Sequence, residues 1–243
     1  MTDAPPLAAI PRCHLIVPCA GVGQRAGTAL PKQYHPLAGQ PMVMHTLAAL
    51  AQVPAIVQGL VVLAPDDDFA WPHTGWPAHF ARAPVGGASR AESVSNGLDW
   101  LLAHGADPQD WVLVHDAARC LVRPQDVQGL IEACASDPVG GLLALPLPDT
   151  LKAARDGRVA QTIPREDKWL AQTPQMARLA VLHAALKAAA AQGYAGITDE
   201  ASALEAQGLR PRLVVGAADN FKITWPADFA LAEAVLAARG VHA

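Results

Sequence analysis

A glycine-rich, basic loop at Pro18–Tyr34 holds the residues best suited to bind a phosphate chain. Gly21 and Gly23 allow a ligand to approach the backbone closely, and they tolerate positive φ angles. Backbone N–H groups in such a loop can surround phosphate oxygens. Arg25 and Lys32 add two fixed positive charges. The loop therefore predicts a site for a nucleoside triphosphate.

The loop departs from two better known phosphate-binding motifs. It lacks the GxxxxGK[ST] pattern of the P-loop, and Ala26 stands at the third glycine of the dinucleotide fingerprint GxGxxG. Alanine is tolerated there, but no acidic residue ends the next predicted strand, Leu60–Ala64. A nicotinamide-dependent oxidoreductase is therefore a weaker alternative, and a flexible glycine turn with surface charges is the simplest one.

Charged residues also follow two later strands. The sequence HDAAR at 115–119 ends an apolar strand, where Asp116 could orient a ribose hydroxyl, a substrate hydroxyl or a metal ion. Asp219 and Lys222 lie in the turn after another strand, and Thr198 begins a helix. Each segment also has an ordinary structural explanation, namely a helix cap, a surface arginine or a polar turn.

Other catalytic chemistries lack their sequence signatures. The chain has no HExxH or CxxC metal pattern and no GxSxG nucleophile elbow, and its nine histidines are scattered. The acidic run 66–68 is better explained as a solvated helix start, because nothing apolar confines it. The spacing of the four cysteines suggests neither a disulfide framework nor a zinc site, so we expect a reducing compartment.

The composition favours one α/β domain. The 243 residues are 51% hydrophobic, which is enough to fill a sizeable core, and we expect a single domain over 1–243. A net charge of -4 disfavours nucleic acid as a partner. The sequence shows neither a signal peptide nor an apolar run of about 20 residues. We therefore expect a soluble, cytoplasmic protein without a membrane partner.

Apolar strand patterns alternate with helical patterns along the chain, and this order shows where the motifs lie in the predicted fold. The predicted strands are 14–18, 60–64, 79–83, 111–115, 141–147, 212–215 and 221–224, and the predicted helices are 41–51, 89–103, 124–134, 177–192, 199–207 and 226–239. Ser89 and Glu92 form a capping box at the second helix. The order predicts a mostly parallel, twisted sheet with helices on both faces. Ligands bind at the carboxyl ends of such strands, where the motif loops lie.

Residues 149–169 interrupt this alternation. Asp156-Gly157 is a hairpin turn signal between the flanks Lys152–Arg155 and Arg158–Ile163. A lone hairpin is only marginally stable in water. We therefore expect a projecting arm that packs on another surface, most economically on a second copy of the chain.

The ordered motifs resemble the 2-C-methyl-D-erythritol 4-phosphate cytidylyltransferase family. The resemblance covers about His14 to Glu233. It rests on the loop ending PKQY at 31–34, Gly86-Gly87 with Arg90 and Ser93, HDAAR at 115–119, Asp149-Thr150 with Lys152, TPQ at 173–175, TDEASALE at 198–205 and DNFKIT at 219–224. It implies a Rossmann-like nucleotidyltransferase fold and a homodimer whose arms, at 149–169, reach into the partner's site. It also implies an isoprenoid-pathway reaction in which CTP and methylerythritol phosphate, with Mg²⁺, give a CDP-alcohol and pyrophosphate.

The resemblance also implies roles for individual residues. Arg25 and Lys32 match the pair that stabilises the charged transition state, and Arg165 and Lys222 match the pair that positions the acceptor phosphate. The positions matching nucleotide-binding residues are Ala20, Gly21, Gly23, Gly87, Ser93 and Asp116. The positions matching residues around the ribose and the alcohol are Ala117, Arg119, Thr150, Thr173 and Thr198. No protein metal ligand is implied, since the CTP phosphates would hold most of the Mg²⁺ coordination.

Three positions depart from the family pattern. Cys19 stands where alanine is usual and could bring an oxidisable thiol near the nucleotide, Ala88 replaces a common acidic residue, and Cys120 replaces a usual proline. None of these removes a charged catalytic candidate. A related ribitol 5-phosphate cytidylyltransferase remains an alternative, although HDAAR and TDEASALE favour methylerythritol phosphate. The retained catalytic cations disfavour a non-catalytic protein of this fold.

Overall fold

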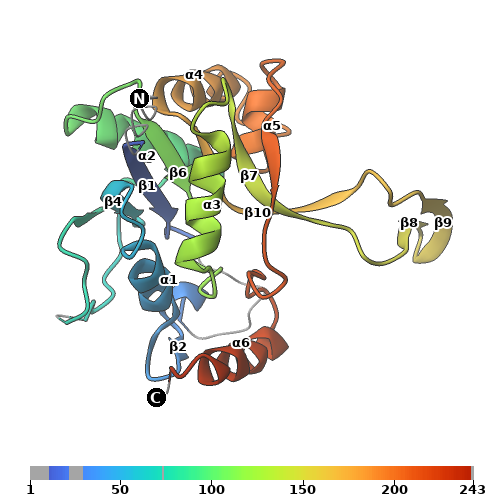
Figure 1. The fold of residues 1–243 in the computed structure, drawn as a ribbon, viewed down its shortest axis with the longest axis horizontal. Helices are drawn as coiled ribbons and strands as arrows, with labels where there is room; N and C mark the ends of the chain where they lie inside the picture. The colour runs from blue at the N-terminus through green and yellow to red at the C-terminus, as the bar shows by residue number, and fades with distance from the viewer. Residues whose placement is uncertain (1–10, 22–29, 73, 242–243) are drawn as a thin grey trace, which may run out of the picture.

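The computed structural model describes residues 11–21, 30–72 and 74–241. Within these residues, seven strands form one twisted sheet in the order β11-β7-β10-β6-β1-β4-β5 (Figure 1). The strands are β1 (Cys13–Pro18), β4 (Ile56–Val62), β5 (Phe80–Ala83), β6 (Trp111–Val114), β7 (Gly140–Pro146), β10 (Trp169–Arg178) and β11 (Arg212–Val215). Neighbours are parallel except at β10, which runs antiparallel to β6 and β7. The predicted mostly parallel sheet is therefore confirmed.

Strand β1 lies between β4 and β6 and is buried on both faces. Its side chains alternate between two core clusters: Leu15 and Val17 pack in one, and Ile16 packs in the other. This is why its apolar run is continuous, as expected for a central parallel strand covered on both sides.

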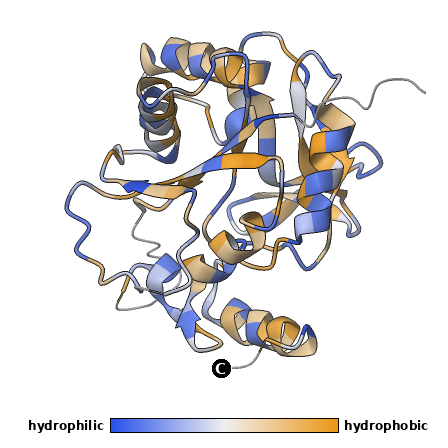
Figure 2. Cartoon of the chain, turned by 60° about the vertical axis from the view of Figure 1, so that its left-hand side comes forward, coloured by the Kyte–Doolittle hydropathy of each residue, from blue (hydrophilic) through white to orange (hydrophobic). Residues whose placement is uncertain are grey.

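Helices cover both faces of the sheet, as predicted. Helices α1 (Met42–Leu50) and α3 (Pro124–Cys134) contribute to the first cluster, and α2 (Arg90–Ala103), α4 (Leu179–Ala190) and α5 (Glu200–Glu205) contribute to the second. In Figure 2 the helices carry both apolar and polar stripes, as expected for helices packed on one side. No helix in the described ranges is long and apolar enough to cross a membrane.

A third cluster lies beyond the carboxyl end of β6. Helix α6 (Pro226–Ala238) packs there through Ala232 and Leu236 against the loop after β6 and a short ribbon. The ribbon consists of β2 (Pro36–Leu37) and β3 (Gln40–Pro41) and follows the 3-10 turn η2 (Lys32–Tyr34). Residues far apart in sequence therefore enclose the carboxyl edge of the sheet.

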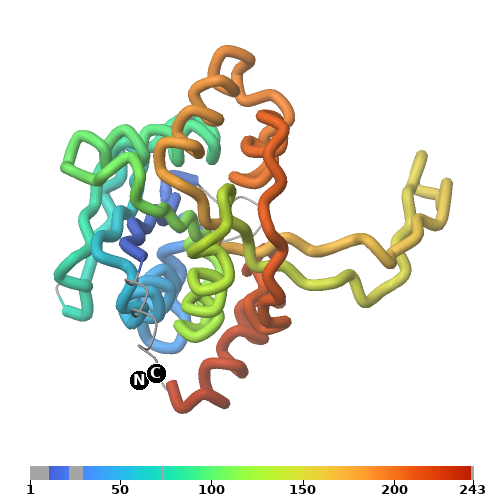
Figure 3. Tube along the Cα trace, turned by 45° about the horizontal axis from the view of Figure 1, so that its top comes forward, coloured from blue at the N-terminus to red at the C-terminus, as the bar shows by residue number. Residues whose placement is uncertain are grey.

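The predicted arm is present as a hairpin. Strands β8 (Leu151–Arg155) and β9 (Arg158–Ile163) pair antiparallel around Asp156 and Gly157, which have φ angles of 51° and 72°. Figures 1 and 3 show the hairpin at the end of two extended segments, well away from the sheet. Val159 is 67% exposed there, so the arm carries apolar surface into solvent.

One long strand was not predicted, and one predicted strand is wrong. Strand β10 was not predicted, because its central residues Gln172–Gln175 are polar and include a proline. These polar side chains are nevertheless buried, and they bond to partners such as Ala217 and Asp199. Residues 221–224 are not a strand, since they form no ladder and instead bond to separate loops.

Several boundaries also shifted. The predicted strand 60–64 is β4, which begins four residues earlier at Ile56, and the predicted helix 177–192 is α4, which begins at Leu179. Pro41 precedes α1 rather than lying in its first turn. Ser89 does cap α2 by accepting the Glu92 N–H, but the Glu92 carboxylate accepts the N–H of Ala88 instead of that of Ser89.

Candidate active site

A pocket of about 390 Å³ opens at the carboxyl ends of β1, β5 and β6. The loops that follow these strands meet there, together with η2 and the segment before α6. The predicted site residues that line it are Ala20, Gly21, Lys32, Gly87, Ser93, Asp116, Ala117 and Lys222. The topology thus brings together residues that span about two hundred positions of sequence, as expected for a ligand site on an open α/β sheet.

Gln33 fixes the start of the glycine-rich loop. Its buried amide donates to the carbonyl oxygens of Cys19 and Gly21, at 2.8 and 2.9 Å. The turn that carries Lys32 is therefore tied to the end of β1. Burial also raises the pKa of the Cys19 thiol far above its ordinary value. Cys19 is thus held as an unreactive thiol.

The loop after β5 packs tightly against the end of β1. A Cβ added at Gly86 would lie 2.4 Å from the Ala20 Cβ and 2.7 Å from the Leu63 carbonyl oxygen, so only glycine fits. Beside it, the Ser93 hydroxyl accepts the Gly87 N–H at 3.0 Å and donates to the Ser89 carbonyl at 2.9 Å. Ser93 therefore shapes the loop and keeps one acceptor lone pair for a ligand.

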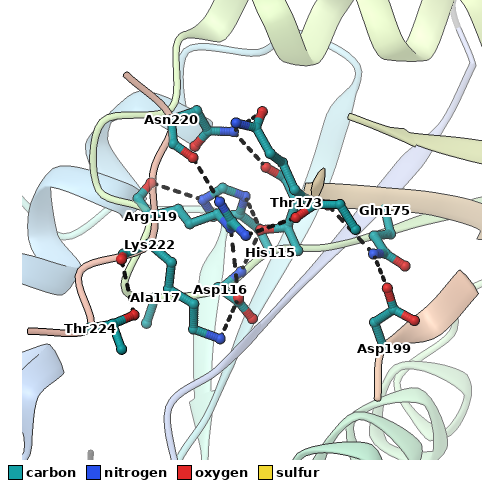
Figure 4. Close-up of polar contacts among 12 residues, drawn as sticks. His115, Asp116, Ala117, Arg119, Thr173, Gln175, Asp199, Asn220, Lys222 and Thr224 are labelled. Carbon is teal, nitrogen blue, oxygen red and sulfur yellow. Dashed lines mark hydrogen bonds and ion pairs between the residues drawn. The ribbon is translucent and has the colours of Figure 1, made fainter. Parts of the chain in front are cut away.

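Asp116 is the centre of a cluster of cations, of which Figure 4 shows Arg119 and Lys222. Its carboxylate lies 2.9 Å from Arg90 Nε, 2.8 Å from Lys222 Nζ and 3.8 Å from Arg119 Nε. Burial alone would raise the pKa of Asp116, but Arg90 and Lys222 outweigh it and hold this pKa far below its ordinary value. Asp116 is therefore ionised at neutral pH and fixes the direction of Lys222.

Arg90 joins this cluster to a second buried carboxylate, Glu200. Two guanidinium nitrogens of Arg90 lie 2.7 and 3.1 Å from the two oxygens of Glu200, whose side chain is 3% exposed. Burial raises the pKa of Glu200, and Arg90 opposes this shift. No role was predicted for Glu200. In the sequence, Glu200 stands out only as a member of the TDEASALE motif. Its pairing with Arg90 could not be inferred, because the two residues are 110 positions apart.

A hydrogen-bond chain supports Asp116 from behind. The Thr173 hydroxyl accepts the Asp116 N–H at 3.0 Å and lies 3.1 Å from His115 Nδ1. The other imidazole nitrogen lies 3.1 Å from the Arg119 carbonyl oxygen and must donate to it. Nδ1 of a neutral imidazole then accepts, so the Thr173 hydroxyl donates to it. Thr173 is 4% exposed and orients Asp116 rather than lining the pocket.

Stability is expected to fall as the pH drops from about 6.5 to 4, partly because of His115. Burial lowers the pKa of His115 to about 4, so the unfolded chain binds a proton before the folded chain does. The contribution is present above pH 6.5 and is lost as the pH falls towards 4, amounting to about 3 kcal/mol. Urea unfolding across this range should show a flatter profile for His115→Gln. The exposed His104→Gln should keep the wild-type slope, and an unchanged slope in His115→Gln would contradict the assignment.

Further cations border the pocket. Lys32 Nζ donates to the Ile223 carbonyl at 2.7 Å, which ties η2 to the segment before α6. Arg119 donates to the Asn220 and Ala171 carbonyls at 2.8 and 3.1 Å, beside the pocket rather than in its lining. Among the described side chains in and around the pocket, the cations outnumber the carboxylates. The cations are Lys32, Arg90, Arg119 and Lys222, and the carboxylates are Asp116 and Glu200. Such a site favours an anionic ligand.

Some predicted residues lie elsewhere. Thr150 and Arg165 lie at the base of the arm, where Arg165 donates to the Pro148 carbonyl oxygen. Neither belongs to the described lining of this chain's own pocket. Thr198 lines a separate cavity of about 130 Å³ behind Arg90. Gly23 and Arg25 lie outside the described residues.

The donors in the pocket suit a metal ion held by a ligand rather than by protein. Across the described residues, no group of three or more histidine, cysteine or acidic side chains is placed to hold a metal. Asp116 is already engaged by Arg90 and Lys222. A magnesium ion in this pocket would therefore take most of its oxygens from phosphates and water, as Mg²⁺ commonly does.

Comparisons with known proteins agree with this geometry. The family model described as IspD, 2-C-methyl-D-erythritol 4-phosphate cytidylyltransferase, matches residues 13–238. A protein of that name from Laribacter hongkongensis is 54% identical over 93% of this chain and 96% of its own length. A bifunctional IspD/IspF enzyme from Albidiferax ferrireducens is 58% identical over 98% of this chain, which spans only 57% of that relative.

Solved structures agree as well. A crystal structure of 4-diphosphocytidyl-2C-methyl-D-erythritol synthase superposes with a TM-score of 0.80 at 37% identity, covering 93% of this chain and 98% of the other. The cytidylyltransferase from Thermus thermophilus gives a TM-score of 0.74 at 35% identity, over 92% and 98% of the two chains. Sequence and fold therefore agree that the chain belongs to the 2-C-methyl-D-erythritol 4-phosphate cytidylyltransferase family.

Proposed function

We propose that this chain transfers the cytidylyl group of CTP to 2-C-methyl-D-erythritol 4-phosphate. The products would be 4-diphosphocytidyl-2-C-methyl-D-erythritol and pyrophosphate, and the name of one crystallised relative gives the first of these as the compound that it makes. The observation that carries the proposal is the pocket at the carboxyl edge of the sheet, which is lined by Lys32 and by Lys222 in its ion pair with Asp116. The family match also argues against the nicotinamide-dependent oxidoreductase.

The chemistry requires charge stabilisation more than proton transfer. The acceptor is a phosphate monoester that is already ionised at neutral pH, so no general base is needed. One of its oxygens forms a bond to the α-phosphorus of CTP, and the bond to the bridging oxygen breaks as pyrophosphate leaves with the electron pair. Fixed cations hold the two anions in line and stabilise the extra charge at the α-phosphate. When bound by the triphosphate, Mg²⁺ neutralises further charge there.

Each cation has a place in this scheme. Lys32, which lies near the end of the glycine-rich loop, would contact the α-phosphate, and Arg25 would act beside it. Lys222 would bind the acceptor phosphate. Asp116 holds Lys222 and would accept a hydrogen bond from a ligand hydroxyl.

The base would be read by the loops after β1 and β5. Backbone groups near Ala20 and Gly87 and the remaining lone pair of Ser93 can meet the edge of a pyrimidine. A carbonyl facing the exocyclic amine would favour cytosine, because uracil would leave buried polar groups unpaired.

The proposal includes a homodimer in the cytoplasm. The arm projects from the body (Figure 3), and Arg165 and Thr150 do not belong to the described lining of their own chain's pocket. A partner subunit would give the arm a surface and receive these residues in its site. The four cysteines are buried free thiols, which suits a reducing compartment.

A pyrophosphate-release assay tests the function. With CTP and Mg²⁺, we expect release with methylerythritol phosphate and little with ribitol 5-phosphate, and CTP should be preferred over UTP. Release with ribitol 5-phosphate alone would transfer the assignment to the related ribitol enzyme. No release with either acceptor would overturn the proposal.

A further inference from the structure

The segment 219–223 contributes residues both to the pocket and to a second cavity. This cavity has a volume of about 730 Å³ and lies between α1, the start of α3 and the end of α6. Lys222 lines the pocket, and Figure 4 shows its side chain directed at Asp116. Asp219, three residues earlier, lines the second cavity. One short segment therefore places Lys222 in the pocket and Asp219 in the second cavity.

Asp219 is clamped by two arginines on the far side from the pocket. Its carboxylate is 2.8 Å from a guanidinium nitrogen of Arg239 and also accepts a hydrogen bond from Arg123. Arg123 caps α3 and Arg239 follows α6, and Arg239 also donates to the Leu121 carbonyl at 2.9 Å. Burial would raise the pKa of Asp219, but the two arginines outweigh it and lower this pKa. The clamp thus joins the segment to two helices.

The rest of the segment has no strand or helix to fix it. It is positioned by contacts with several other elements. The Asn220 side-chain amide donates to the Thr173 carbonyl at 2.9 Å and the Asn220 carbonyl accepts from Arg119, while Ile223 is fully buried and donates its N–H to the Ala118 carbonyl at 2.9 Å. The Ile223 carbonyl in turn accepts from Lys32. A shift of this segment would therefore displace Lys222 and the partner of Lys32 together.

We propose that Asp219 is a positioning residue for the reaction. With Arg123 and Arg239, it holds the segment so that Lys222 Nζ points into the pocket. None of the three belongs to the described pocket lining, so their effect on the reaction must be transmitted by the segment, through Lys222 and through the Ile223 carbonyl that Lys32 contacts. This inference rests on the proposed function, because it concerns the placement of the acceptor phosphate.

Asp219→Asn tests the inference, because asparagine keeps the shape but loses the charge that pairs with both arginines. We expect the KM for methylerythritol phosphate to rise on the order of 10-fold to 10²-fold, while the KM for CTP changes little. Asp219→Glu should restore much of the loss. Glu132→Gln is the matched control, since Glu132 lies on the exposed side of α3 and its carboxylate accepts a hydrogen bond from Gln128 of the same helix. It should behave as the wild type.

A second measurement is independent of turnover. Hydrogen exchange at the Ile223 amide of the unliganded protein should be faster in Asp219→Asn than in the wild type or Glu132→Gln. Unchanged kinetics and unchanged exchange in Asp219→Asn would overturn the inference, as would an equal loss in Glu132→Gln. An inactive wild type would refute the proposed function instead, and the exchange data would still decide whether Asp219 fixes the segment.

Discussion

Replacing Lys32 by alanine is expected to lower kcat on the order of 10²-fold to 10³-fold while the protein remains folded. Lys32 lines the pocket, and its ammonium is directed by the Ile223 carbonyl at 2.7 Å. In the proposed reaction, this ammonium would stabilise the negative charge that increases at the α-phosphate in the transition state.

The measurement is the steady-state rate of pyrophosphate release, with circular dichroism to confirm folding. Lys187→Ala is the matched control. Lys187 lies on α4 and pairs with Asp99 of α2, and neither residue belongs to the described pocket lining. The control should retain the wild-type kcat. A kcat for Lys32→Ala within a factor of about two of the control would remove Lys32 from the catalytic set, since the loss of a transition-state donor costs far more.

The same variant can test the arm. Arg165→Ala should also be nearly inactive if Arg165 acts in the partner's site. A mixed dimer of Lys32→Ala and Arg165→Ala subunits would then contain one intact site, so mixing the two variants should restore activity. Absence of restoration in a verified mixed dimer would place Arg165 and Lys32 in the same chain's site.

The sequence was sufficient for elements whose residues follow simple periodic patterns. The apolar run of β1 predicted a buried strand, Ser89 predicted the start of α2, and Asp156-Gly157 predicted the arm's turn. Strand β10 was missed because its polar residues bond to partners that are remote in sequence, such as the Gln175 amide to Asp199. The strand propensities of single residues cannot predict that these buried polar groups find hydrogen-bond partners, since the strand's stability comes from tertiary contacts.

The pocket was predictable to a similar extent. The strand-end rule placed Gly21, Gly87 and Asp116 at one edge of the sheet, and the structure brings them together. The sequence did not reveal that Thr173 lies behind Asp116, nor that Glu200 reaches the cluster. Both depend on side-chain geometry between distant elements, and no spacing rule applies to them.

Arg90→Met is expected to lower the free energy of unfolding by about 3–5 kcal/mol. Arg90 is the shared cation of Glu200 and Asp116, and Glu200 is almost fully buried. Methionine fills similar volume but leaves the Glu200 carboxylate buried without its bidentate partner. The raised pKa of Glu200 would rise further, and the residual cost would appear as lost stability in urea unfolding at neutral pH.

Two comparisons separate charge from packing. Adding Glu200→Leu to Arg90→Met should recover part of the stability, because an apolar pair leaves no uncompensated charge at Glu200. Arg12→Met breaks an exposed ion pair with Asp110 and should cost less than about 1 kcal/mol. If Arg90→Met cost no more than Arg12→Met, Glu200 would have to be neutral in the folded protein.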